Sequence, residues 1–192
     1  PIMYGCDNFC SYCIVPYVRG RERSRAPQRV LEEAKQIIAG GAKEITLLGQ
    51  NVNSYGKGLD EEEKINFSQL LRKINDLPGD FRIRFMTSHP KDCTTELIDT
   101  IAEEPKILPY LDIPMQHCNN NILKLMNRRD TKASLVALVN KLRERIPNLV
   151  LRTSLIAGLP YEGEEEFEEL CDFLRRFRLE RVGAFAFSPE EG

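Results

Sequence analysis

Apolar residues recur along this chain with two different periods. Short runs rich in β-branched and aromatic residues, typical of buried strands, alternate with stretches in which apolar residues return every three or four positions, typical of amphipathic helices. The predicted strands cover residues 2–4, 44–48, 82–86, 110–114, 148–155 and 181–187. The predicted helices cover about 28–38, 67–74, 94–102, 120–126, 132–145 and 164–177. Each strand but the last is therefore followed by helical sequence.

This alternation predicts an α/β fold with parallel strands joined by right-handed crossovers. Six units favour a partial (βα)6 barrel over a closed eight-stranded barrel, with an open side that would admit a large substrate. In such folds ligands bind at the carboxyl ends of the strands. Unusual polar or small residues stand at those positions, namely Cys6, Gln50, Ser88, His89, Gln116, His117 and Gly158.

The composition is that of an ordinary soluble protein. The chain has 192 residues, of which 42% are hydrophobic and 29% charged, and its formal net charge is -2. This length suits one sizeable core, so we expect a single domain over residues 1–192. No hydrophobic leader or long apolar run is present, and six cysteines are too few for a disulfide scaffold of this size. We therefore expect a cytoplasmic protein that does not bind membranes.

Cys6, Cys10 and Cys13 place three thiolates on one short loop with the spacing C-x3-C-x2-C. An iron–sulfur cubane normally has four cysteine ligands, so three leave one iron open to a small molecule. This spacing, with Tyr12 before the last cysteine, resembles the cluster loop of the radical S-adenosylmethionine (SAM) enzymes. In that superfamily SAM occupies the open iron, and an electron from the cluster cleaves it to methionine and a 5′-deoxyadenosyl radical that abstracts hydrogen from the substrate.

Structural zinc is the alternative for these cysteines. Zinc takes four ligands, often in C-x2-C pairs, and a fourth would have to come from residues that stand alone, namely Cys93, Cys118, Cys171, His89 or His117. A different class of function also stays open at this point, a non-catalytic iron–sulfur or zinc module that binds RNA through its arginines.

Longer segments resemble the radical SAM methylthiotransferases, which replace a C–H hydrogen with a methylthio group. Residues 5–25, 48–56 and 87–92 resemble the branch that modifies N6-isopentenyladenosine in tRNA. Residues 110–117 and 181–192 resemble the sister branch that modifies an aspartate of a small-subunit ribosomal protein. The resemblance implies a methylthiotransferase core acting on C2 of the tRNA adenosine, with the ribosomal aspartate as the alternative substrate.

The resemblance also implies roles for individual residues. Cys6, Cys10 and Cys13 would hold a 4Fe-4S cluster, with Gly5 letting the backbone pass close to it. Tyr12 would lie against the SAM adenine, the alternative being an aromatic packed beneath the loop. The candidates for binding the amino acid and ribose parts of SAM are Gln50, Ser88, Gln116 and Arg152. The Arg152 guanidinium matches a carboxylate fork, although polar residues at strand ends also serve to satisfy loops.

Arginines crowd the segment after the cysteine loop, at Arg19, Arg21, Arg23 and Arg25. Arginine contacts RNA phosphates and stacks on bases, so this arginine cluster would hold an anticodon loop at the site, with the target adenosine splayed out. The alternative is salt bridging to Glu22, Glu32 and Glu33. The acidic run 162–169 is expected to be solvated surface.

Three departures from the family pattern are visible. The family's amino-terminal domain, which binds a second 4Fe-4S cluster, and its carboxyl-terminal RNA-binding β-barrel are both absent from these 192 residues, so the second cluster is expected only in a full-length protein. Relatives usually carry Gly-Phe-Pro-Gly where this chain has Gly158-Leu159-Pro160-Tyr161, and a tyrosine in a glycine's place is expected to alter the turn. Flavodoxin or ferredoxin is the expected electron donor, and a monomer the expected state.

Overall fold

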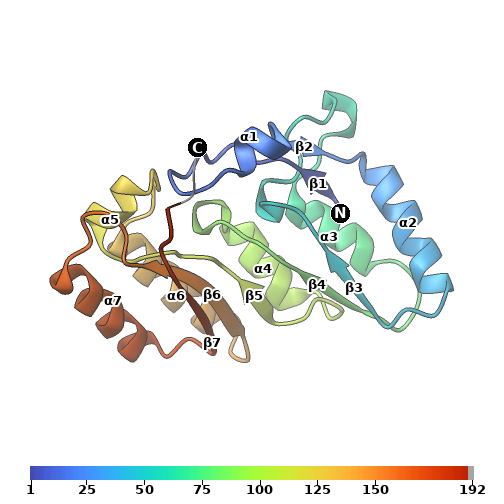
Figure 1. Ribbon diagram of the computed structural model, residues 1–192. Coiled ribbons are helices and arrows are strands. Elements are labelled where there is room, and N and C mark those ends of the chain that lie inside the picture. The colour runs from blue at the N-terminus through green and yellow to red at the C-terminus, as the bar shows by residue number, and fades with distance from the viewer. Residues whose placement is uncertain (190–192) are drawn as a thin grey trace.

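The computed structural model describes residues 1–189. Its parallel strands are β3 (Glu44–Leu47), β4 (Arg82–Phe85), β5 (Tyr110–Asp112), β6 (Val150–Ala157) and β7 (Arg181–Ala186). β3 pairs with β4, and β5, β6 and β7 pair in that order. Two hydrogen bonds join the β3–β4 pair to the β5–β7 strands: the Ile83 N–H donates to the Lys106 carbonyl (2.7 Å), and the Ser88 N–H donates to the Asp112 carbonyl (3.0 Å). The strands thus follow one another in sequence order as an open, partial barrel (Figure 1).

The first strand is paired differently from the expectation. β1 (Met3–Tyr4) runs antiparallel to a short β2 (Arg23–Ser24), which the sequence pattern did not predict. β1 also lies beside the end of β3, because the Ile2 N–H donates to the Leu48 carbonyl (2.8 Å). Between β1 and β2 the cysteine loop and the five-residue helix α1 (Val15–Arg19) turn the chain back on itself. α1 was also not predicted, since five residues are too few to show a helical period.

The longer helices begin and end within about one residue of their predicted bounds. They are α2 (Pro27–Ala39), α3 (Phe67–Asn75), α4 (Thr95–Glu103), α5 (Asn120–Leu125), α6 (Lys132–Arg145) and α7 (Glu164–Phe177), with single 3-10 turns η1 (Val52–Ser54), η2 (Glu61–Glu63) and η3 (Pro90–Asp92). At the starts of α3, α4, α5 and α6 a polar side chain satisfies free backbone N–H groups, which helps to fix where these helices begin. The Thr94 hydroxyl, for example, accepts from Leu97 N–H at 3.2 Å.

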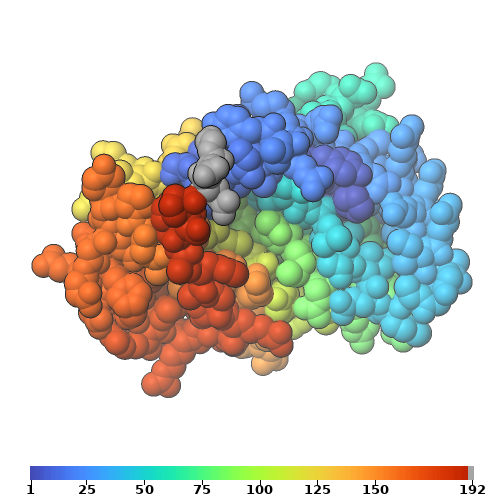
Figure 2. All heavy atoms as spheres, in the orientation of Figure 1, coloured from blue at the N-terminus to red at the C-terminus, as the bar shows by residue number. Residues whose placement is uncertain are grey.

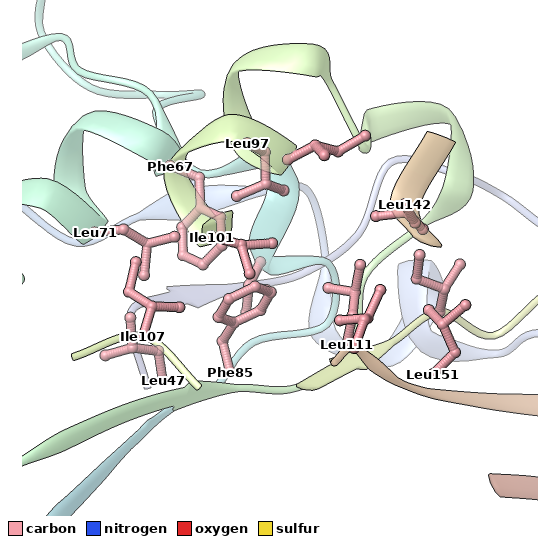
Figure 3. Packing of buried hydrophobic residues seen from close by; sticks show 14 of the residues in the cluster. Leu47, Phe67, Leu71, Phe85, Leu97, Ile101, Ile107, Leu111, Leu142 and Leu151 are labelled. Carbon is pink, nitrogen blue, oxygen red and sulfur yellow. The ribbon is translucent and has the colours of Figure 1, made fainter. Parts of the chain in front are cut away.

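The core lies between the sheet and the helices that cover it (Figure 3). Phe67 of α3 and Phe85 of β4 meet edge to face, with ring centroids 5.0 Å apart. Leu97 and Ile101 of α4 lie close to these rings, and Leu111 of β5 continues the apolar layer toward β6. All of these side chains are buried. This packing fixes the strands on which the functional residues stand.

β7 is the exposed edge of the sheet. Most of its residues are exposed, including Val182 and Phe185, and Figure 2 shows this segment in red on the surface of the molecule. Residues 190–192, part of the segment that resembles the ribosomal branch, lie outside the described residues. In residues 1–189 no helix combines the length and the apolar character needed to cross a membrane.

Replacing Phe85 by alanine is expected to lower the free energy of unfolding by about 3–5 kcal/mol, because the ring is fully enclosed and leaves a cavity. Phe185→Ala is the matched control: its ring is 58% exposed, so the loss is expected to stay below about 1 kcal/mol. Urea unfolding of the two variants measures both values. An equal loss of unfolding free energy in the two variants would show that Phe85 does not belong to the core.

Candidate active site at the carboxyl ends of the strands

A cavity of about 330 Å³ opens at the carboxyl ends of β3, β4 and β5. Cys6, Cys10 and Cys13 all line it. The cavity is also lined by polar residues of the cysteine loop, of the segments that follow the strands and of the turn after α5, among them Asn8, Tyr12, Gln50, Thr87, Ser88, Gln116 and Arg128. The fold therefore brings together the cysteine loop and most of the polar residues that the sequence places after the strands.

The start of the cysteine loop is held by a close backbone contact. Gly5 has φ +75°, and a Cβ there would lie 2.1 Å from the Arg21 carbonyl oxygen, so only glycine fits. The Cys6 N–H donates to the Gly20 carbonyl (3.2 Å). Arg21 Nε donates to the Asp7 carboxylate at 2.7 Å, which also accepts from the Glu22 N–H. Gly5 thus allows the loop to lie against residues 20–21, a contact that the sequence pattern did not identify.

The other end of the loop is bound to the second half of the chain. The Ser11 N–H donates to the Met126 carbonyl (3.1 Å), and the Ser11 hydroxyl to the Leu125 carbonyl (2.8 Å). The Asn127 side chain donates to the Phe9 carbonyl at 2.8 Å. The three cysteines are therefore positioned by contacts more than 100 residues away in sequence.

The thiols suit an iron–sulfur cluster by their chemistry. Cys6 is buried, and burial raises the pKa of its thiol, with Glu22 and the other two cysteines adding to the rise. Coordination to iron removes a thiol proton, so a bound cluster would hold these three cysteines as thiolates. A four-iron cluster binds each thiolate through a different iron, so its ligands surround a space instead of converging on a point. Within residues 1–189 no three His, Cys, Asp or Glu side chains are grouped to hold a single metal ion.

Several buried polar atoms at the cavity lack hydrogen-bond partners in the described part of the chain. They are the Asn8 Oδ1, Gln50 Oε1, Ser88 Oγ and Arg128 Nε atoms. Ser88 is only 1% exposed. A buried polar atom without a partner is costly, and native structures keep few of them. These atoms are therefore available to a polar ligand, which fits a molecule such as SAM with its amino acid and ribose groups.

Three non-glycine residues that line the cavity have left-handed backbone, namely Phe9 in the cysteine loop (φ +49°) and two residues that follow strands. Thr87 has φ +67° and Gln116 has φ +70°. The left-handed region is unfavourable for a β-branched residue such as threonine. Hydrogen bonds hold both: the Thr87 carbonyl accepts from Val52 N–H (3.1 Å), and the Gln116 N–H donates to the Ser154 carbonyl (2.9 Å). Such strain is often kept at functional sites, where it aims the following residue into a cavity.

Arg128 is a residue of the cavity that sequence reasoning missed. It stands in the turn after α5 and is buried, and its Nη2 donates to the Pro114 carbonyl at 3.0 Å. Its Nη1 donates to the Tyr12 hydroxyl (3.3 Å), and its guanidinium pairs with Asp130 at 3.2 Å. The Nε has no partner among the described residues. No local pattern distinguishes this arginine from its neighbour Arg129, so only the tertiary contacts identify it.

Both histidines accept a hydrogen bond from a nearby backbone N–H. His89 lines the cavity, and its Nδ1 accepts from the Lys91 N–H at 3.2 Å; burial lowers its pKa to about 3, so the ring is neutral. His117 is fully buried outside the cavity, and its Nδ1 accepts from Asn119 N–H at 2.9 Å. Its Nε2 faces a Glu162 carboxylate at 3.5 Å whose side chain is only 2% exposed. The acidic run is therefore not wholly solvated surface, because Glu162 turns inward.

Some predicted residues are not brought to the cavity. The Arg152 guanidinium, on β6, pairs with the buried Asp112 at 2.7 Å and does not line the cavity. In the arginine cluster, Arg21 pairs with Asp7 and Arg25 with Glu33 (both 2.7 Å). The buried Glu22 pairs with Lys57 instead of an arginine.

The other cysteines and the Gly158–Tyr161 turn also lie away from the cavity. Cys93, Cys118 and Cys171 are free thiols, and none of them lines it. Burial raises the pKa of both Cys93 and Cys118 to about 12, as expected for small buried side chains. The turn keeps left-handed backbone at both ends, with φ +80° at Gly158 and +69° at Tyr161. The tyrosine thus retains a glycine-like conformation.

Comparison with known proteins adds the family. The family model of the radical SAM superfamily matches residues 1–174. The chain is 52% identical over 191 residues to the tRNA-2-methylthio-N(6)-dimethylallyladenosine synthase of Alkaliphilus oremlandii, and 50% identical over 191 residues to the synthase of the same name from Thermoanaerobacter pseudethanolicus. Each match covers 100% of this chain and 40% of the relative. The chain thus spans about 40% of the length of the curated relatives it matches.

Solved structures agree on the fold. The radical S-adenosylmethionine methyltransferase TsrM from Kitasatospora setae superposes with a TM-score of 0.75 at 19% identity, covering 96% of this chain and 35% of that one. The cobalamin-dependent S-adenosylmethionine radical enzyme OxsB gives 0.70 at 16% identity, covering 90% and 25%. The predicted α/β partial barrel is confirmed. The chain belongs to the radical SAM superfamily, and its predicted resemblance to the methylthiotransferases is confirmed by its identity to the two synthases at about half of its positions.

Proposed function

We propose that this chain is the radical SAM core of a methylthiotransferase that modifies C2 of N6-isopentenyladenosine in tRNA. The observation that carries the proposal is the agreement between sequence and site. The chain is 50–52% identical to two tRNA-modifying synthases over its whole length, and its three clustered cysteines line one cavity at the strand ends. These matches include the second half of the chain, whose resemblance to the ribosomal-protein branch therefore carries less weight.

Cys6, Cys10 and Cys13 would hold the 4Fe-4S cluster, with SAM beside it. When bound, these cofactors supply the 5′-deoxyadenosyl radical that activates the C–H bond. Ser88, Gln50 and Gln116 present polar groups to SAM, and two of them carry the unpartnered oxygen atoms described above.

Arg128 is the better-placed guanidinium for a SAM carboxylate: each arginine pairs with one aspartate, but Arg128 lines the cavity and Arg152 does not. The Arg128 Nε is still without a partner in the described residues. Tyr12 is oriented by its hydrogen bond from Arg128 and forms a wall of the cavity, where its ring faces bound SAM.

Arginines near the cavity are the proposed contacts for tRNA. Arg19 and Arg23 are exposed and have no ion pair within residues 1–189, whereas Arg21 and Arg25 are partly neutralised by Asp7 and Glu33. Arg19 and Arg23 are therefore the members of the arginine cluster best able to contact RNA phosphates.

The remaining parts of the proposal concern the whole protein. The transfer of sulfur would need the second 4Fe-4S cluster, which we assign to sequence beyond this core. We further propose a cytoplasmic monomer that receives electrons from flavodoxin or ferredoxin. The six free thiols of the chain agree with a reducing compartment.

The first test is anaerobic reconstitution of the chain with iron and sulfide, followed by reduction with SAM and assay for 5′-deoxyadenosine. Cys10→Ala is expected to abolish product, because it removes a cluster ligand. Cys171→Ala is the matched control, and it is expected to keep full activity because that thiol lies on α7 away from the cavity. Formation of 5′-deoxyadenosine by Cys10→Ala would refute the proposal. The proposal would also be refuted if the wild-type chain carried a complete cluster, formed no product and showed no spectroscopic change when SAM was added.

Ser88→Ala is expected to change stability and SAM affinity in opposite directions. Without SAM the variant should be as stable as the wild type or about 1 kcal/mol more stable, because an unpaired buried hydroxyl is removed. SAM affinity should fall about 10-fold, the value of about one hydrogen bond. Urea unfolding and equilibrium dialysis with the reconstituted chain measure the two effects.

Ser54→Ala is the control, because Ser54 is equally a buried serine but its hydroxyl donates to the Asn51 carbonyl at 2.9 Å. This variant is expected to lose about 1 kcal/mol of stability and to keep its SAM affinity. A Ser88→Ala chain with unchanged SAM affinity would remove Ser88 from the proposed site.

A further inference from the structure

A second cavity, of about 210 Å³, adjoins the cysteine cavity at Tyr12, which lines both. Its walls are formed by Tyr12, Ile122, Leu125, Met126, Leu159 and Pro160. These residues come from the cysteine loop, the α5 region and the turn after β6. Tyr12 borders both cavities, so the two spaces are neighbours that share one side chain.

The surface of this second cavity is apolar. Of the three hydroxyl-bearing residues that line it, two are already engaged: the Ser11 hydroxyl donates to the Leu125 carbonyl at 2.8 Å, and the Tyr12 hydroxyl accepts from Arg128 at 3.3 Å; the third is the exposed Tyr161. The remaining wall residues are aliphatic, aromatic or sulfur-containing. The cavity therefore suits a hydrocarbon group that makes no hydrogen bonds.

Tyr161 lines the same cavity and is 87% exposed. Its backbone is left-handed, with φ +69°, which is unfavourable for a tyrosine. The turn is held by Glu162, whose carboxylate accepts from Leu159 N–H at 2.9 Å and whose N–H donates to the Leu159 carbonyl at 3.0 Å. The ring gains little from packing at this exposure, so neither burial nor backbone preference accounts for a tyrosine here. An exposed ring beside an apolar cavity is suited to stacking on a base.

We propose that this second cavity receives the dimethylallyl group of the target adenosine, with Tyr161 stacking on the base. The inference rests on the proposed function. It names the recognition site for the substrate that this function requires. Five carbon atoms, each taken as about the 30 Å³ of a water molecule, need about 150 Å³, which the cavity provides.

The position of the cavity also suits the proposed reaction. In adenine only N1 separates C2 from the carbon that bears N6, so a group held at N6 leaves C2 a few bonds away. With the dimethylallyl group held there, the base edge that carries C2 is directed toward the cysteine cavity that adjoins it at Tyr12. Burial of the hydrocarbon would thus both select the prenylated base and orient it.

The test compares the binding of N6-isopentenyladenosine and of adenosine to the reconstituted chain, each measured by saturation-transfer NMR titration. The prenyl methyl protons are expected to receive the strongest saturation, and the prenylated nucleoside to bind about 100-fold more tightly, since several buried CH₂-sized groups contribute. Leu159→Trp fills the cavity and should abolish this preference. Val182→Trp, at an exposed apolar residue of β7, is the matched control and should retain it.

Tyr161→Gly tests the stacking ring without endangering the fold, because glycine adopts the left-handed conformation more readily than tyrosine. Its urea midpoint should not fall, while the affinity for N6-isopentenyladenosine should drop about 10-fold. Tyr161→Phe should preserve the affinity. Unchanged binding by Tyr161→Gly would overturn the stacking role.

The outcomes separate this inference from the proposed function. A wild-type preference for the prenylated nucleoside that survives in Leu159→Trp, with an unchanged urea midpoint, would overturn the cavity assignment and leave the proposed function standing. No preference in a wild-type chain that forms 5′-deoxyadenosine would also overturn it, with radical chemistry intact. No preference, together with no 5′-deoxyadenosine from a chain whose complete cluster is spectroscopically unchanged by SAM, would refute both.

Discussion

The backbone at Gly5 packs so closely against the backbone of residues 20–21 that no side chain can be accommodated there. The organisation of the site depends on this backbone contact. The cysteine loop has almost no regular structure of its own, so its shape is imposed by what it touches. At one end the backbone at Gly5 lies against the carbonyls of residues 20–21, and at the other Ser11 is bound to the end of α5. A loop fixed at both ends can hold three thiols around one cavity before any ligand is present, which reduces the entropy lost on binding.

The parallel sheet supplies the rest of the site at the cost of local strain and unpaired polar atoms. Thr87 and Gln116 take left-handed backbone at the ends of β4 and β5, and Ser88 and Gln50 keep buried oxygens without partners in the described residues. The buried packing of Phe67, Phe85 and Leu111 beneath these residues stabilises the sheet enough to tolerate both. The same buried packing that stabilises the core therefore also supports the strained residues of the cavity.

Tyr12 borders two chemically distinct spaces. One is lined by thiols, amides, an imidazole and a guanidinium, and the other mainly by aliphatic and aromatic side chains. A polar cofactor and an apolar substrate group would thus be bound in adjoining spaces that share one ring, which Arg128 orients. Of the two histidines, His89 lines the first of these spaces and His117 lines neither; each accepts a nearby backbone N–H at its Nδ1.

The sequence by itself determined the order and nearly all bounds of the longer elements, the open parallel barrel, the three cysteines and the strand ends at which the cavity lies. These follow from local periodicity, capping residues and spacing, which are properties of neighbouring residues. Only the tertiary structure decided that β2 pairs with β1, that Arg128 lines the cavity while Arg152 is engaged by Asp112, and that Gly5 serves a contact with residues 20–21. It also formed the apolar cavity from segments as distant as Tyr12 and Leu159. The reason is physical: such partners lie far apart in sequence, and a guanidinium or a cavity wall acquires its surroundings only when the chain has folded.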